Sequence, residues 1–189
     1  MLLPMETLTD RVKAEVMKTL VDSGAEKVNL LGWSRWGLAA RAAASQLPER
    51  IASVTTVCTP HRGLRASESP LGRPAVKCWT RCFGGRTEGF SLAVSELSPG
   101  FMRSFNEKYP NARGVYYQSC ACAMGKNNDR ALAPANSILS ILDGENDGVV
   151  SVYSALWGQY GMVVRGVSHL KAGEELYGGL IERLVQMNL

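Results

Sequence analysis

The first predicted helix lies near the start of the chain, where apolar residues recur at helical spacing with lysine and glutamate between them: Val12, Val16, Leu20 and Val21. This periodicity predicts an amphipathic helix. We expect Thr7 or Thr9 to cap its start through a side-chain oxygen. Gly24 is placed to end it, because glycine takes the left-handed conformation that closes many helices.

The next segments alternate short apolar runs with a helical pattern. Residues 28–32 form an apolar run bounded by a turn, which predicts a buried strand. Residues 38–47 are rich in alanine and end at Pro48, which predicts a helix that lies close to its neighbours. Residues 52–60 are rich in β-branched side chains and predict a second strand. The order helix, strand, helix, strand favours a parallel sheet covered by helices.

The second half continues this alternation. Ser98-Pro99 predicts a helix start, with serine as the cap and proline in the first turn. Residues 114–120 and 161–164 predict two further strands, and residues 174–187 predict a closing amphipathic helix. Residues 137–142 fit either a helix or a strand, and residues 143–148 predict a tight turn.

The segment from His61 to about Gly89 interrupts the pattern. It is rich in Gly, Pro, Ser, Arg and Cys and has little periodicity. Such a length is unusual for a plain connection, so we expect a functional or mobile, lid-like excursion at about 62–89 and the least ordered part of the chain. The whole chain, 1–189, is expected to form a single α/β domain.

Composition excludes several classes of protein. The chain has 189 residues, 46% of them hydrophobic and 20% charged, which is ordinary for a globular domain. A net charge of +4 without a dense Lys/Arg run does not indicate nucleic-acid binding. No apolar stretch reaches the roughly 18 residues of a membrane helix, and the first residues lack the pattern of a signal peptide.

The histidine and cysteine counts exclude two kinds of metal site. Two histidines exclude a multi-histidine metal site within one chain, and the five cysteines contain no CxxC spacing. Cys58 is typical of a small buried hydrophobe. Cys120 and Cys122 would share one face of a strand, whereas Cys78 and Cys82 are left open as a pair or as free thiols. We expect reduced thiols throughout.

The most informative local feature is a strand, a turn and a helix with Ser34 on the turn. In that context the hydroxyl is exposed beside a helix N-terminus, which favours an oxyanion, so Ser34 is a candidate nucleophile. A serine needs a base and an orienting acid. His169 and Asp147 are the candidates, because the order Ser34, Asp147, His169 is that of α/β-hydrolases.

Other residues are weaker candidates for the same roles. Asp143 and Glu145 are rival carboxylates that rank behind Asp147, which could also be a plain turn residue. His61 is the only other histidine, and its TPHRG context resembles a bacterial lipase motif that is structural or pocket-forming, so we expect it not to be the base.

Residues 28–64 read VNLLGWSRWGLAARAAASQLPERIASVTTVCTPHRGL, and this run resembles the nucleophile-elbow region of bacterial triacylglycerol lipases of the α/β-hydrolase fold. LDGENDGVVSVYSALWG and GVSHL are similar to the acid and histidine loops of that family. The resemblance implies Ser34 as nucleophile, Asp147 as acid, His169 as base and the backbone N–H of Arg35 as an oxyanion donor. It places the excursion at 62–89 over an acyl pocket.

The chain departs from the family pattern at several points. Trp36 stands where the family has glycine, so its indole should either strain the turn, at about 1–3 kcal/mol, or turn outward. Trp33 replaces a histidine. No His-Gly sequence for a second oxyanion donor precedes the first helix, so we expect the early strands to be absent and the first strand to be an exposed edge. Lys171 stands near the position of a family calcium-binding aspartate, which disfavours calcium.

These features predict a carboxylic ester hydrolase, of the triacylglycerol or lipid-ester class, that acts through an acyl-serine intermediate. The alternative is an inactive relative or binding module, favoured by Trp36 and by the missing oxyanion loop. We expect no cofactor, no bound metal and no nucleic-acid partner. The expected partners are a lipid or small ester, a lipid surface in transient contact, and a second copy at the exposed sheet edge. The family is often secreted, but the sequence leaves localisation open.

Overall fold

The computed structural model describes residues 3–82, 88–125, 129–173 and 175–189. Within these residues four strands form one sheet in the order β1-β2-β3-β4, and every neighbouring pair is parallel. The strands are β1 (Val28–Trp33), β2 (Ile51–Val57), β3 (Tyr116–Ala123) and β4 (Tyr160–Arg165). The predicted α/β class with a mostly parallel sheet is therefore confirmed.

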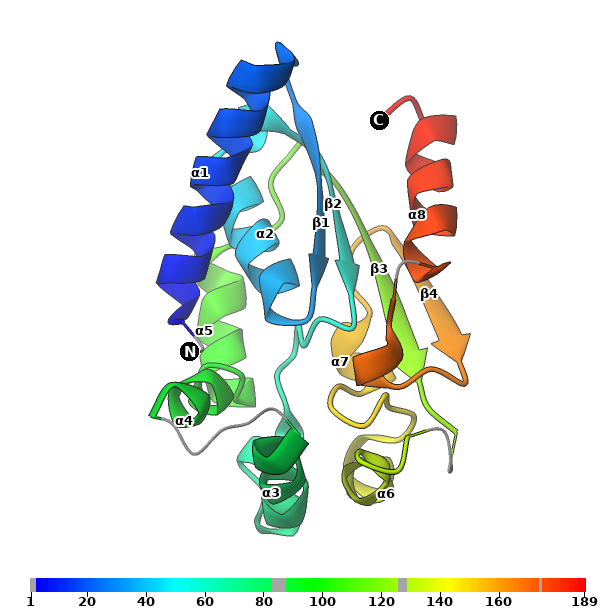
Figure 1. Ribbon diagram of the computed structural model, residues 1–189. Coiled ribbons are helices and arrows are strands. Elements are labelled where there is room, and N and C mark those ends of the chain that lie inside the picture. The colour runs from blue at the N-terminus through cyan, green and yellow to red at the C-terminus, as the bar shows by residue number, and fades with distance from the viewer. Residues whose placement is uncertain (1–2, 83–87, 126–128, 174) are drawn as a thin grey trace.

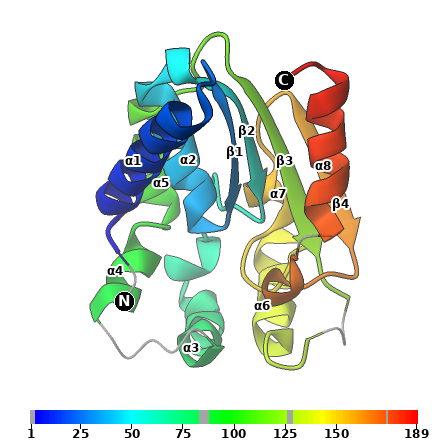
Figure 2. The same ribbon diagram turned by 45° about the horizontal axis from the view of Figure 1, so that its top comes forward.

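Helices cover both faces of this sheet (Figure 1; Figure 2). The helices α1 (Met5–Ser23), α2 (Arg35–Gln46) and α5 (Pro99–Lys108) lie on one side, and α8 (Glu175–Gln186) lies on the other. Ala40 and Ala44 of α2 pack on Ile51 and Val54, because small side chains let the helix approach the sheet closely. On the opposite face, Leu180 of α8 packs against the strand ends.

Three further helices gather beyond the carboxyl ends of the strands (Figure 1). They are α3 (Arg73–Cys82), α4 (Glu88–Ser95) and α6 (Ala133–Asp143), whereas the short helix α7 (Val152–Ala155) packs alongside β3. The ambiguous run at 137–142 belongs to α6, whose Leu139 is buried while Ile141 faces solvent. Short 3-10 turns at Pro48–Arg50, Arg65–Ser67, Pro70–Gly72 and His169–Lys171 complete the chain.

The segment between His61 and Gly89 is more regular than its composition predicts. The expectation of an aperiodic excursion is wrong for residues 73–82, which form α3. Trp79 is the physical reason: its side chain is 1% exposed in the main core, and its indole Nε1 donates to Gly148 O at 2.8 Å. Residues 83–87 of the predicted excursion lie outside the described residues.

Two smaller expectations also need correction. The helix α1 begins at Met5, ahead of Thr7, and the Thr9 hydroxyl donates to Met5 O at 2.9 Å instead of capping the helix. The strand at 28–32 is present as β1, but it is not buried. It is the edge strand of the described sheet, and Leu31 is 41% exposed, so the expectation of an exposed edge is confirmed and that of a buried strand is wrong.

Several other expectations are confirmed. Ser98 caps α5, because its Oγ accepts from the backbone N–H of Phe101 at 3.2 Å. Gly24 ends α1 with φ of 69°, and all five cysteines are free thiols. No helix within the described residues has the length and apolar character needed to cross a membrane.

Candidate active site

Ser34 lies on the sharp turn between β1 and α2. Its φ of 54° is in the left-handed region, which is uncommon for a residue with a side chain. The turn is held by two backbone hydrogen bonds, from Ser34 N to Val57 O at 2.8 Å and from Gly37 N to Ser34 O at 3.1 Å. The backbone therefore presents the Ser34 hydroxyl beyond the end of the edge strand.

Two glycines make this turn sterically feasible. A Cβ on Gly32 would lie 2.6 Å from the Cα of Gly37, and a Cβ on Gly37 would lie 2.1 Å from Oγ1 of Thr59. The tight approaches are thus at Gly32 and Gly37. Of the two outcomes expected for Trp36, a strained turn or an outward indole, the structure has the second. Trp36 is 44% exposed and lines a groove with α1, so its indole takes the outward orientation.

Asp147 lies in the loop between α6 and α7 and is 1% exposed. Its Oδ1 accepts from the backbone N–H groups of Val149 at 2.9 Å and Val150 at 2.7 Å. The neighbouring Asn146 braces the same loop, because its Oδ1 accepts from Gly148 N and from Asn136 Nδ2, both at 2.9 Å. The backbone N–H groups thus engage Oδ1 of Asp147 and leave Oδ2 directed toward His169.

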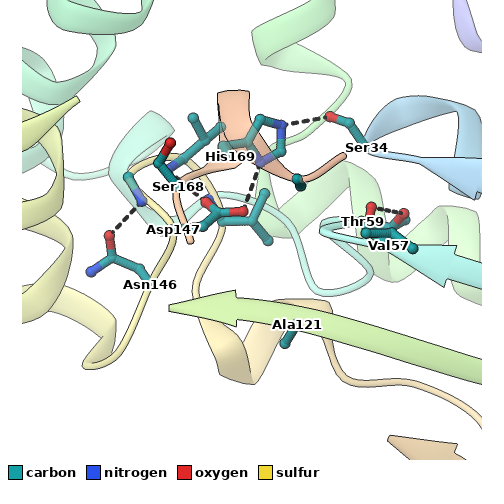
Figure 3. A network of polar contacts seen from close by, with 12 residues as sticks. Ser34, Val57, Thr59, Ala121, Asn146, Asp147, Ser168 and His169 are labelled. Carbon is teal, nitrogen blue, oxygen red and sulfur yellow. Dashed lines mark hydrogen bonds and ion pairs between the residues drawn. The ribbon is translucent and has the colours of Figure 1, made fainter. Parts of the chain in front are cut away.

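His169 joins Asp147 to Ser34 (Figure 3). Its Nδ1 is 2.7 Å from Asp147 Oδ2, and its Nε2 is 3.1 Å from Ser34 Oγ. The backbone N–H of His169 also donates to Asp147 O at 2.8 Å. The two segments are therefore joined by a backbone hydrogen bond as well as by the side-chain contact. The structure therefore brings the three predicted residues together in one continuous line of contacts.

The rival carboxylates have other partners. Asp143 pairs with Arg65 at 3.1 Å, and Glu145 pairs with Arg165 at 2.8 Å. The hydrogen bond from Arg165 lowers the pKa of Glu145. Both carboxylates are thus engaged by arginines, whereas Asp147 contacts His169.

His61 has the structural role that the sequence indicates. It is fully buried, with Nδ1 at 3.1 Å from Nη1 of Arg41 and Nε2 at 2.9 Å from Oγ1 of Thr56. Its ring also stacks on Trp157 at a centroid distance of 5.2 Å. Burial, with the charges of Arg41 and Arg62, lowers the pKa of His61 well below 6.5. His61 is therefore held neutral in the interior.

A cavity of about 390 Å³ opens on Ser34 and His169. Most of its lining is apolar, and it includes Trp33, Leu64, Trp79, Leu97 and Val149. The sequence did not identify Trp79 as a lining residue, because the composition of its segment suggested an irregular loop.

The side chain of Arg35 has a partner that the sequence did not suggest. Its guanidinium forms an ion pair with Glu96, which follows α4. Burial lowers the pKa of Arg35 even though Glu96 opposes that shift. Both oxygens of Glu96 also accept from the backbone N–H of Met5, at 3.1 and 3.2 Å. Glu96 thus joins the turn at Ser34 to the start of α1.

The chain is similar in sequence to curated triacylglycerol lipases. The chain is 31% identical over 120 residues to a triacylglycerol lipase of Pseudarthrobacter phenanthrenivorans, which covers 54% of this chain and 38% of that protein. It is 28% identical over 170 residues to triacylglycerol lipase 2 of Saccharomyces cerevisiae, covering 86% of this chain and 51% of that protein. The chain thus spans about half or less of the length of these relatives. No family model matches the sequence.

Solved structures share the fold. The mature form of the Bacillus licheniformis lipase BlEst2 matches with a TM-score of 0.76 at 22% identity, over 96% of this chain and 74% of that one. The metagenomic carboxyl esterase MGS0156 matches with a TM-score of 0.64 at 20% identity, over 86% of this chain and 51% of that one. The chain thus has the α/β-hydrolase fold of these structures, and in sequence it is similar to triacylglycerol lipases.

Proposed function

We propose that this protein hydrolyses carboxylic esters, of the triacylglycerol or lipid-ester class, through an acyl-serine intermediate. The observation that carries the proposal is the line of contacts from Ser34 Oγ through both nitrogens of His169 to Asp147 Oδ2, at 3.1 and 2.7 Å. Ser34 and His169 line an apolar cavity, which offers space for an acyl chain. The similarity to triacylglycerol lipases supports the same reaction class.

In the first half of this reaction, Ser34 Oγ attacks the ester carbonyl while His169 Nε2 takes the hydroxyl proton. Asp147 accepts from Nδ1–H, which holds the imidazole in the tautomer with a free Nε2 and stabilises the imidazolium. The N–H of Arg35, at the start of α2, is the proposed donor to the oxyanion, aided by the positive end of the helix. His169 then protonates the leaving alcohol.

In the second half, a water molecule releases the acyl group. His169 Nε2 takes a proton from the water as it attacks the acyl-serine carbonyl, and the same oxyanion donor acts again. Collapse of the intermediate frees the carboxylic acid and returns the proton to Ser34 Oγ. The cycle consumes one ester and one water and needs no cofactor.

The experiment is covalent labelling with a fluorophosphonate probe alongside turnover of p-nitrophenyl esters. The parent chain should be labelled and should hydrolyse the ester, and Ser34→Ala should abolish both. Ser137→Ala is the matched control, because this exposed serine of α6 donates to Ala133 O of its own helix. Folded parent protein without labelling or turnover would overturn the proposal and favour an inactive relative or binding module.

A further inference from the structure

The thiol of Cys58 lies close to the side chains of Asp147 and His169. It follows β2, is fully buried, and its backbone N–H donates to Cys120 O at 2.8 Å. The Sγ of Cys58, a carboxylate oxygen of Asp147 and a ring nitrogen of His169 all lie within 4.8 Å of one another. Residues far apart in the sequence thus place a thiol, a carboxylate and an imidazole around one point, and the proposed reaction does not use the thiol.

These three donors suit one class of cation. Thiolate sulfur, imidazole nitrogen and carboxylate oxygen are the ligands of zinc, and thiolate further favours soft metals over calcium or magnesium. We propose that the chain binds a divalent cation of the zinc–cadmium class through Cys58, Asp147 and His169, and that the bound cation stops ester hydrolysis. The second part rests on the proposed function, whereas the binding itself does not.

Charge balance favours such a site. The ligand set of a carboxylate, a neutral imidazole and a thiolate carries two negative charges. Binding of a dication with loss of the Cys58 proton to solvent brings two positive and two negative charges together, so the buried site becomes neutral. A hydrogen bond with Cys122 lowers the pKa of Cys58, but burial and Asp147 outweigh it and the pKa is raised. Cation binding should therefore tighten as pH rises.

The geometry requires small adjustments in both directions. Donors on one tetrahedral zinc are about 3.5 Å apart, given Zn–S and Zn–N bonds of about 2.3 and 2.0 Å. The widest pair here is separated by at most 4.8 Å and must close by about 1 Å, whereas Asp147 Oδ2 and His169 Nδ1, at 2.7 Å, must open by about 0.6 Å. Cys58 lies just beyond the end of β2, with φ of 50°, Asp147 lies in a loop, and His169 begins a short 3-10 turn. The adjustments therefore involve no strand residue.

The cation would block the base by moving one proton. His169 Nδ1 is the ring nitrogen beside Asp147 Oδ2, at 2.7 Å. A neutral imidazole carries a single ring proton, so coordination at Nδ1 transfers that proton to Nε2. Nε2 then donates to Ser34 Oγ instead of accepting its proton, and the nucleophile is not activated.

The binding test uses Cd²⁺, because a cadmium–thiolate bond absorbs in the ultraviolet. The background protein carries Cys78→Ser and Cys82→Ser, which removes the two less buried thiols. Titration should produce the absorbance in this background. Cys58→Ser, which keeps the size of the side chain, should weaken binding at least about 10-fold. Cys120→Ala is the matched control, because this buried thiol lies outside the donor set.

Cys58→Gly guards against a folding defect, because glycine adopts φ of 50° without strain. Circular dichroism should show the background fold in each variant. Equal cadmium absorbance in the Cys58 variants and the background, or no absorbance in the background, would overturn the site.

The inhibition has its own readout. Cd²⁺ should slow fluorophosphonate labelling of Ser34 in the background protein and in Cys120→Ala, but not in Cys58→Ser. Labelling that Cd²⁺ does not slow would overturn the inhibition. Absence of labelling without cation would instead refute the proposed hydrolysis, while the absorbance still decides the cation site.

Discussion

His61 and His169 are the two histidines of the chain, and both are buried with partners at both ring nitrogens. Their surroundings differ in the sign of the nearest charge. His61 faces the guanidinium of Arg41, whereas His169 faces the carboxylate of Asp147. The cation beside His61 opposes protonation of that ring.

The second difference is access. His61 is enclosed by Thr56, Arg41 and the stacked ring of Trp157. His169 lines the cavity that also contains Ser34. Burial alone therefore does not distinguish a structural histidine from a candidate base. The charge beside one nitrogen and the group beside the other make the distinction.

The largest expected effect separates the two histidines directly. His169→Ala should lower ester turnover by about 10,000-fold or more, because Ser34 loses its base. His61→Ala should leave turnover per folded molecule close to that of the parent and should lower the free energy of unfolding by about 3 kcal/mol, through a cavity and unpaired polar groups. Turnover with p-nitrophenyl esters and urea unfolding measure the two effects. Equal loss of turnover in both variants would contradict the comparison.

The next effect concerns the charge beside His169. Asp147→Asn should lower turnover by about 10,000-fold, because an amide favours the wrong imidazole tautomer. Asp143→Asn is the matched control, since Asp143 pairs with Arg65. Fluorophosphonate labelling rates give the measurement. An equal effect of the two substitutions would remove Asp147 from its proposed role.

The charge beside His61 predicts a pH dependence of stability. Its pKa is lowered well below 6.5 in the folded state, so the unfolded chain binds the proton more readily. The contribution of His61 is fully present above about pH 6.5 and is lost as pH falls below it, by at most about 1.4 kcal/mol per pH unit. His61→Gln should remove this part of the slope in urea unfolding between pH 6.5 and 5. An unchanged slope would show that His61 takes up its proton in the folded state.

The smallest effect concerns the turn that presents Ser34 to His169. Trp36→Gly should cost about 1 kcal/mol of stability, as glycine does in a helix, and should leave the labelling rate within about twofold. The reason is that the tight contacts lie at Gly32 and Gly37, whereas the indole is 44% exposed. Gly37→Ala, which places a methyl group against Thr59, is the contrasting variant and should cost more stability. A marked rise in labelling for Trp36→Gly would show that the indole strains the turn.

Local patterns were sufficient for much of the fold and for the three site residues. The β-branched run before Cys58, the alanine-rich helix and the serine between a strand and a helix are all encoded within a few neighbouring residues. Ser34, Asp147 and His169 could be ranked because each follows or precedes a recognisable strand, and parallel strands bring their ends to one edge. Their mutual distances required the folded chain.

Other features depended on tertiary contacts that no local pattern encodes. The helix around Trp79 forms in a segment of irregular composition because the indole is buried and bonded to Gly148. The ion pair of Arg35 with Glu96 joins residues 61 positions apart.

The sequence by itself therefore determined the order of strands and helices and the candidate site residues, because these depend on local periodicity and residue type. The tertiary structure decided which glycines allow the tight turn at Ser34 and which histidine faces a carboxylate. It also placed the Cys58 thiol close to Asp147 and His169. The physical reason is that close approach, burial and the sign of a neighbouring charge are properties of residues distant in sequence that meet only in the folded state.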